Sequence, residues 1–150
     1  MTLEILFRYL HFIAIFVMVS SIVGEHLLLK PRMTRSEILR MSALDAVYGI
    51  SALLIVAFGL TLWFGGIGKP AEIYSKNWVF HLKITLFVIV ALLSIYPTIF
   101  FLKNRKGNDM NELVDIPKNI IWMIRFELFL LVFIPLCATL MARGVGYFGN

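Results

Sequence analysis

Four long runs of apolar residues alternate along the chain with short segments rich in charge, glycine and proline. Each run reaches the length of about 20 residues that a helix needs to cross the hydrocarbon core of a bilayer. Each run also ends at a glycine, a proline or a cluster of charges, which are typical helix stops. The pattern therefore predicts four membrane-spanning helices, at about residues 3–29, 42–64, 78–102 and 120–142.

Two polar segments indicate where helices begin. The segment TRSE, from Thr34 to Glu37, has the pattern of a capping box, in which a threonine hydroxyl accepts a hydrogen bond from the N–H three residues later. The second helix is therefore expected to begin in water, a turn or two before the membrane. In the segment DIPK, Asp115 lies near an expected N-cap and Pro117 in an expected first turn.

The composition supports a location in the membrane. Of the 150 residues, 60% are hydrophobic and 15% are charged, and the mean hydropathy is +0.87. A soluble domain has about 25% charged and about 45–50% apolar residues. We therefore expect an all-α, integral membrane four-helix bundle that forms one domain over residues 1–150 and contacts the lipid bilayer. The net charge of +5 does not indicate a nucleic-acid partner, because the basic residues flank apolar runs instead of covering one surface.

Lysine and arginine are unevenly distributed among the connecting segments. The middle segment holds only Lys69 and Lys76, whereas the first and third are richer in basic residues. Because basic loops stay in the cytoplasm, both termini are expected on the opposite side, the periplasm of a bacterial inner membrane. The basic residues behind this orientation are Lys30, Arg32, Arg35 and Arg40 in the first segment, and Lys103, Arg105, Lys106 and Lys118 in the third.

Ionisable groups inside a membrane span are costly and tend to mark function. Five lie toward the expected cytoplasmic side and form a predicted buried polar cluster: Glu25, His26, Asp45, Arg125 and Glu127. One interpretation is structural, with Glu25 or Asp45 paired to Arg125 so that the helices dock in one way. Another is a proton or substrate site. A third is that several of these side chains extend into the lipid headgroups.

A second polar group lies toward the other side of the membrane and comprises Arg8, His11, His81 and Lys83. Imidazole is a common axial ligand of haem iron, and four-helix bundles can hold cofactors between their helices. His11 is the prime ligand candidate. Lys83 or His81 is the candidate for a second ligand or for a contact to a haem propionate, which Arg8 could also hold. The alternatives are hydrogen bonding of the histidines at the membrane interface and outward extension of Lys83.

Three stretches carry a resemblance to a known family: GEHLLLKP, DAVYG and LLSIYPT. Over roughly residues 1–105 the chain resembles a family of small, uncharacterised bacterial four-helix inner-membrane proteins. The resemblance implies the four-helix topology and implies no specific function.

His11 in YLHFIAIF and Lys83 in FHLKITLF carry a more distant resemblance. They look like a first-helix histidine and a third-helix lysine of HemJ-type protoporphyrinogen oxidases, and the chain is also distantly similar to copper-resistance-D-like membrane proteins. HemJ-type proteins are understood to bind haem b. The stretch VMVSSIVGEHLL departs from the tryptophan-rich HemJ pattern. The resemblance therefore implies haem b on His11 and does not extend to protoporphyrinogen oxidation.

Three hypotheses of function follow. The leading one is a haem-b-binding membrane protein with a redox role. The second is a non-catalytic accessory subunit of a larger membrane complex, in which buried charges fix the packing of helices. The third is a small proton or solute transporter that uses Glu25, Asp45 and Glu127 and, with only four helices, works as a homo-oligomer. No motif of a soluble enzyme is present in the sequence.

Overall fold

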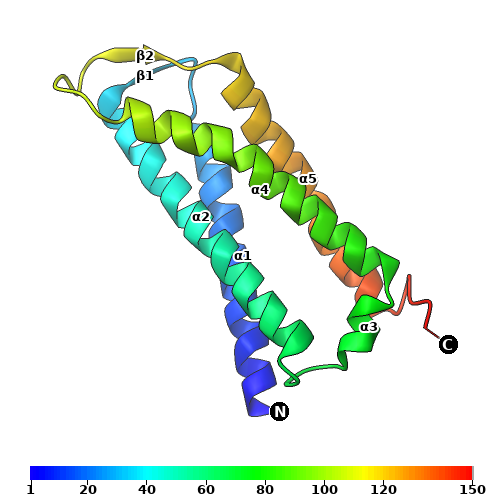
Figure 1. The fold of residues 1–150 in the computed structure, drawn as a ribbon. Helices are drawn as coiled ribbons and strands as arrows, with labels where there is room; N and C mark the ends of the chain where they lie inside the picture. Colours follow the sequence, from blue (N-terminus) through cyan, green and yellow to red (C-terminus); the bar gives the residue numbers. More distant parts are fainter. Residues whose placement is uncertain (150) are drawn as a thin grey trace.

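The structure is a computed structural model that describes residues 1–149, and it consists of four long apolar helices packed as a bundle (Figure 1). Each is long and apolar enough to cross a membrane. This confirms the predicted all-α four-helix membrane bundle and implies contact with the lipid bilayer. The long helices are α1 (Thr2–Leu28), α2 (Arg35–Phe64), α4 (Trp78–Asn104) and α5 (Lys118–Ala142); the short elements are β1 (Arg32–Thr34), α3 (Ala71–Ser75) and β2 (Leu113–Asp115).

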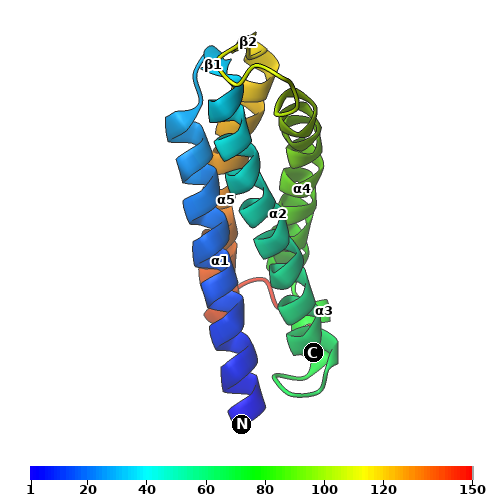
Figure 2. The same ribbon diagram turned by 90° about the vertical axis from the view of Figure 1, so that its left-hand side faces the viewer.

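The helices run up and down, with α1 beside α2 and α4 beside α5, and further contacts join α2 to α4 and α1 to α5. Figures 1 and 2 show β1 and β2 at one end of the bundle, which we call the strand end. The N-terminus, α3 and the C-terminal segment lie at the other end, which we call the α3 end. The two connections that are rich in lysine and arginine therefore share the strand end.

The start of α2 agrees with the capping pattern in the sequence. Thr34 Oγ1 accepts a hydrogen bond of 3.2 Å from Glu37 N, and α2 begins at Arg35, ahead of the apolar run that was expected from residue 42. The Glu37 carboxylate lies near Thr34 and also accepts a hydrogen bond of 3.0 Å from Lys30 Nζ. The first turn of α2 is thus tied to the end of α1 by a cation.

The strand end is closed by a short antiparallel pairing of β1 and β2, with Arg32 opposite Asp115. Arg32 Nε donates a hydrogen bond of 2.8 Å to Asp115 Oδ1. Asp115 therefore does not cap α5 as the sequence suggested; the N-cap of α5 is Pro117, which offers no side-chain acceptor. Beside the strands, Arg35 Nη1 donates to the carbonyl oxygens of Asn104 and Lys106.

The α3 end is held by Asn77, which is buried. Its Oδ1 accepts hydrogen bonds from Val79 N and Phe80 N and so caps α4. Its Nδ2 donates to Val145 O at 3.2 Å, and its backbone pairs with Tyr147. The C-terminal segment is therefore fastened to the first turn of α4.

The distribution of apolar and polar side chains is the one expected of a helix bundle in a membrane. Large apolar side chains cover the outside of the bundle, and the exposed fractions of Leu53 and Val132 are 73% and 70%. Inside, an apolar core includes Ile22, Val90 and Ile124. Because lipid is as apolar as the core, the outward leucines and valines cost nothing there, and polar side chains that turn inward stand out.

Candidate functional site

Three carboxyl side chains and one phenol meet inside the bundle: Glu25 from α1, Asp45 and Tyr48 from α2, and Glu127 from α5. We call them the carboxyl cluster. Their exposed fractions are 2% for Glu25, 6% for Asp45, 2% for Tyr48 and 2% for Glu127. Acidic residues are almost never buried to this degree unless a partner compensates them.

Helical spacing explains why these residues turn inward. Buried positions recur every three or four residues on each helix, as they do on one face of an α-helix. The carboxyl groups occupy positions of these faces that otherwise carry apolar or small residues. The faces consist of Ala14, Met18, Ser21, Ile22 and Glu25 on α1; Ile38, Met41, Ser42, Asp45, Tyr48, Ser51 and Ile55 on α2; and Ile120, Ile124, Glu127 and Leu131 on α5.

Several polar atoms of the cluster lack a hydrogen-bond partner. In residues 1–149, Glu25 Oε1 and Glu127 Oε1 are buried without a hydrogen-bond partner, and the buried Tyr48 hydroxyl lies beside the Glu127 carboxyl group. No lysine or arginine of the described chain forms a salt bridge with the three carboxyl groups. A buried polar atom without a partner costs about 1–3 kcal/mol, so the cluster is a costly arrangement as it stands.

The members of the cluster lie close enough to interact electrostatically. Glu25 faces both Asp45 and Glu127, and the Tyr48 side chain faces all three carboxyl groups. From α4, Thr98 is the polar neighbour of Asp45. Toward the strand end, Arg105 Nη1 donates a hydrogen bond of 3.3 Å to Ser42 Oγ. Ser42 precedes Asp45 by one turn, so Arg105 stands at the strand-end side of the cluster.

Arg125 departs from the expected cluster. Its side chain is exposed, and its guanidinium carbon lies 5.7 Å from the centre of the Trp122 ring on the outside of α5. The expected ion pair with Glu25 or Asp45 is not formed, since Arg125 is two residues from Glu127 and so points about 200° away from it around the helix. His26 is half-buried beside Glu25 and belongs to the last turn of α1.

The second group of candidates divides into an inner and an outer pair. His11 and Lys83 are half-buried and near enough to interact across the bundle. Lys83 Nζ lies 5.1 Å from the centre of the Phe80 ring and faces Cys137 of α5. The ring of His11 packs against Gly59, where an added Cβ would lie 3.4 Å from Cε1. His11 Nδ1 is buried without a partner in the described chain.

His81 and Arg8 have partners of their own. His81 is exposed, and its Nε2 is 2.8 Å from Ser75 O at the α3 end. Arg8 Nη2 lies 2.7 Å from Glu4 Oε1 in an ion pair one turn apart. Of the four residues that the sequence grouped, the structure therefore brings Lys83 and Arg8 into the surroundings of His11, whereas His81 is held at the α3 end.

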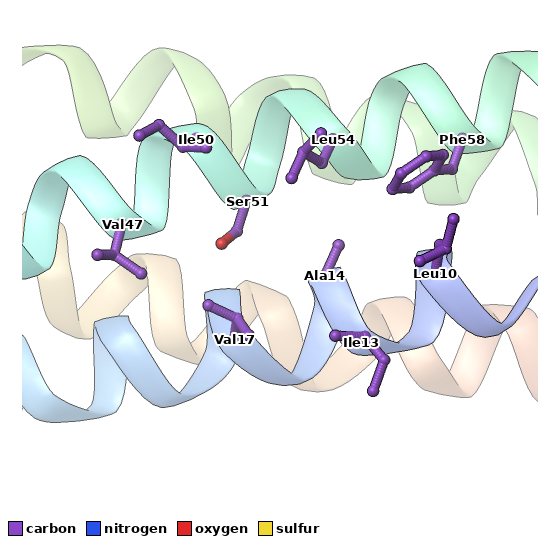
Figure 3. A pocket seen from close by; sticks show the side chains of 9 residues that line it. All are labelled: Leu10, Ile13, Ala14, Val17, Val47, Ile50, Ser51, Leu54 and Phe58. Atoms are coloured by element: carbon purple, nitrogen blue, oxygen red, sulfur yellow. The ribbon is translucent and has the colours of Figure 1, made fainter. Parts of the chain in front are cut away.

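A groove between α1 and α2 opens toward the outside of the bundle, and Figure 3 shows its apolar lining. Its volume is about 350 Å³, and Ser51 is its one polar side chain. Neither His11 nor Lys83 lines it. The lining residues are Leu10, Ile13, Ala14, Val17, Val47, Ile50, Ser51, Leu54 and Phe58.

Two residues of these sites escaped the sequence-based interpretation. Tyr48 is uncharged and lies in a membrane span, so the sequence pattern did not single it out. Its place three residues after Asp45 nevertheless puts it on the same helical face. Cys137 on α5 is the second such residue. It is buried, and only the packing of α4 against α5 reveals Lys83 as its neighbour.

A family model described as "Predicted membrane protein (DUF2214)" matches residues 3–146. Neither the curated proteins nor the solved structures contain a match to the chain. The family description names a membrane protein and no activity, so the expected resemblance to an uncharacterised membrane-protein family is confirmed. The likeness to haem-binding proteins stays a prediction.

Proposed function

The chain belongs to the DUF2214 family of membrane proteins, and we propose that it binds and exchanges protons at the carboxyl cluster inside its bundle. The observation that carries the proposal is the burial of Glu25, Asp45 and Glu127 against one another with no basic residue paired to them. The function is that of a small proton-conducting or proton-coupled membrane protein.

Electrostatics supports a bound positive charge at the cluster. Close carboxylates in a medium of low polarity repel strongly, and each proton that binds to one of them lowers this repulsion. A proton on Glu25 or Glu127 also gives that carboxyl group an O–H donor, which an oxygen of a neighbouring member of the cluster can accept. Interacting carboxyl groups of this kind take up and release protons as one coupled unit.

The donor set favours a proton over a metal ion. Among the described residues, no three acidic, histidine or cysteine side chains converge closely enough to hold a metal. Tyr48 and Thr98 add hydroxyl groups, which can donate and accept protons in a hydrogen-bonded chain. The cluster therefore has the chemistry of a proton relay inside a membrane.

The proposed route reaches the cluster from the strand end. On α1, Glu25 is three residues from the last helical residue, Leu28, which is about 5 Å along the axis. The lysines and arginines of the two strand-end connections support a cytoplasmic location of this end by the positive-inside rule. Protons would thus enter the cluster from the cytoplasmic side of a bacterial inner membrane.

Counting bound protons tests the proposal. Purified protein in lipid nanodiscs is titrated with a pH-indicator dye, and wild type is compared with a Glu25→Gln/Glu127→Gln double variant. We expect wild type to exchange about one more proton per chain than the double variant in the neutral range. Glu72→Gln is the matched control, because Glu72 is an exposed carboxylate on α3, outside the carboxyl cluster.

Equal proton counts for wild type and the double variant in the neutral range would overturn the proposal. The carboxyl groups would then have the structural role that the accessory-subunit hypothesis assigns to them. Association with a larger membrane complex or with further copies of the chain stays a prediction, and co-purification of a fixed partner would support it.

Haem binding at His11 is the second candidate function. It is favoured by the buried and unpartnered Nδ1 of the His11 ring, beside Lys83. His81 is not available to this site while it is bound to Ser75 O, so Lys83 would be the only neighbouring candidate of the predicted set. Protein from haem-replete cells should show a Soret band that His11→Ala removes; colourless protein would exclude this function.

A further inference from the structure

We propose that His11 and Lys83 form a second proton-binding site, separated from the carboxyl cluster by an apolar layer, and that protons cross the bundle between the two. The inference rests on the proposed function of the carboxyl cluster and adds the part of the proton route that runs from the cluster to the α3 end. The two sites lie on one stripe of α1, with Glu25 fourteen positions after His11, or about 21 Å along the axis.

The second site is an interior group of basic side chains. Lys83 forms no salt bridge within residues 1–149, and its Nζ contacts the face of the Phe80 ring. Imidazole is the side chain best suited to pass a proton on, because it accepts at one nitrogen and donates at the other. His11 Nδ1 is buried without a hydrogen-bond partner in residues 1–149, and it can accept a proton in the tautomer that carries hydrogen on Nε2.

Titratable side chains around His11 come from α1, α3, α4 and α5. Those that act on His11 are Arg8 on α1 and Lys83 on α4, with Cys137 of α5 behind Lys83. Tyr74 of α3 and Glu4 of α1 face Arg8. From α2 the neighbours are Gly59 and the backbone of Ile55, which carry no charge. The charged groups that act on His11 are therefore basic, whereas those of the carboxyl cluster are acidic, so the two sites differ in kind.

The apolar layer consists of Ala14, Met18, Ile55 and Val90, which are all buried in the same core. On α1, Ala14 and Met18 lie between His11 and Glu25. On α2, Ile55 lies between Tyr48 and Gly59, the neighbour of His11. On α4, Val90 lies between Lys83 and Thr98, the neighbour of Asp45. Three helices thus place apolar side chains between the sites.

Small hydroxyl side chains border the layer on the side of the carboxyl cluster. Ser21 and Ser51 are buried, and Ser51 also lines the groove between α1 and α2 (Figure 3). Ser21 Oγ donates to Val17 O at 2.8 Å and so keeps its lone pairs free. Water that enters the layer could hydrogen-bond to these hydroxyl groups, which allows a transient proton path.

The transfer conserves every atom. A carboxyl O–H of the cluster gives its proton to a water in the hydrated layer, and that water passes a proton to His11 Nδ1. The opposite ring nitrogen releases its proton to water at the α3 end, and the carboxylate takes up a new proton from the strand end. Rotation of the imidazole ring, or proton exchange with water, then restores the starting tautomer of His11. Because the layer itself offers only apolar side chains, a proton crosses it only when water enters.

Proton flux into vesicles tests the inference. Wild-type protein is reconstituted into liposomes that contain a pH-sensitive dye, and a pH step is applied outside. We expect flux above that of protein-free liposomes, and a loss of at least tenfold in His11→Gln and in Lys83→Gln. In both variants, the further change Glu25→Gln/Glu127→Gln should still remove about one proton per chain from the neutral-range count, because the carboxyl cluster is intact. Gel filtration establishes that each variant is folded.

A second variant opens the layer. Val90→Ser should raise the flux several-fold by admitting water, whereas Val88→Ser, a lipid-facing position of the same helix, should leave the flux unchanged. Wild-type vesicles without flux, His11→Gln and Lys83→Gln with full flux, or Val90→Ser with no increase would each overturn the inference. Failure of this inference can be told apart from failure of the proposed function. Only failure of the proposed function removes the difference in proton count between wild type and Glu25→Gln/Glu127→Gln.

Discussion

Arg105 Nη1 donates a hydrogen bond of 3.3 Å to Ser42 Oγ. Arg105 is the C-cap residue that directly follows α4, and Ser42 is buried on α2 one turn before Asp45. The contact fixes a positive charge at the strand-end side of the carboxyl cluster. A fixed cation repels metal ions that approach the cluster, while a proton can still pass along hydrogen bonds of water and hydroxyl groups.

The first prediction concerns this charge. Arg105→Gln should make the carboxyl cluster accessible to sodium, so the thermal unfolding midpoint of the variant should rise with NaCl relative to an equal concentration of choline chloride. Wild type should show no such difference. Lys103→Gln, which removes an exposed charge nearby, is the control. A variant that responds to sodium no more than wild type does would count against a selective role for Arg105.

Asn77 provides a second prediction. Asn77→Ala removes the acceptor for Val79 N and Phe80 N and the link to Val145 O, so it should destabilise the protein by about 1–2 kcal/mol, the usual effect of losing an N-cap. The change is measured as a lower thermal unfolding midpoint in detergent. Asn119→Ala, at an exposed position of α5, should have little effect. Equal midpoints for the two variants would contradict the assigned role.

The two arginines of the strand end should differ in their contributions. Arg35 is nearly enclosed, with 12% of its side chain exposed, and it donates to Glu112 as well as to two carbonyl groups. Arg35→Ala should therefore cost about 2–3 kcal/mol. Arg32, with 69% of its side chain exposed in its pair with Asp115, should contribute less than about 1 kcal/mol. Similar unfolding midpoints for Arg35→Ala and Arg32→Ala would refute this ranking.

Membrane orientation is open to direct labelling. In a Cys137→Ala background, a cysteine is introduced either by Glu72→Cys at the α3 end or by Asn108→Cys at the strand end. An impermeant maleimide added to bacterial spheroplasts should modify the first variant at once and the second only after permeabilisation. The reverse pattern would place the strand end outside and invert the proposed direction of proton entry.

The apolar runs were sufficient to predict the four helices, because length and hydropathy alone decide whether a segment can cross a bilayer. The pairing of β1 with β2 was not predictable in the same way. Arg32 and Asp115 are far apart in the sequence, and each strand has only three residues, too few for a periodic pattern. The pairing exists because the packing of the helices brings these two connections to one end.

The direction in which a side chain points around its helix decides which candidate site residues meet in the structure and which lie apart. Glu25, Asp45 and Glu127 share faces with buried residues, so their meeting could be expected once the helix neighbours were known. Arg125 and His81 lie two positions from Glu127 and Lys83, and they point away from these partners. A similar depth in the membrane was therefore not enough to predict which residues meet. Their meeting also depends on how each helix is rotated about its axis, and this rotation is set by helix packing, which a single sequence does not reveal.

The most direct test of the carboxyl cluster is infrared spectroscopy of the protein in lipid. At neutral pH, wild type should show the C=O stretching band of a protonated carboxyl group, shifted in heavy water. The Glu25→Gln/Glu127→Gln variant should lose this band, whereas Glu72→Gln should keep it. A wild-type spectrum without the band, or a band that survives in the double variant, would contradict a proton held inside the bundle.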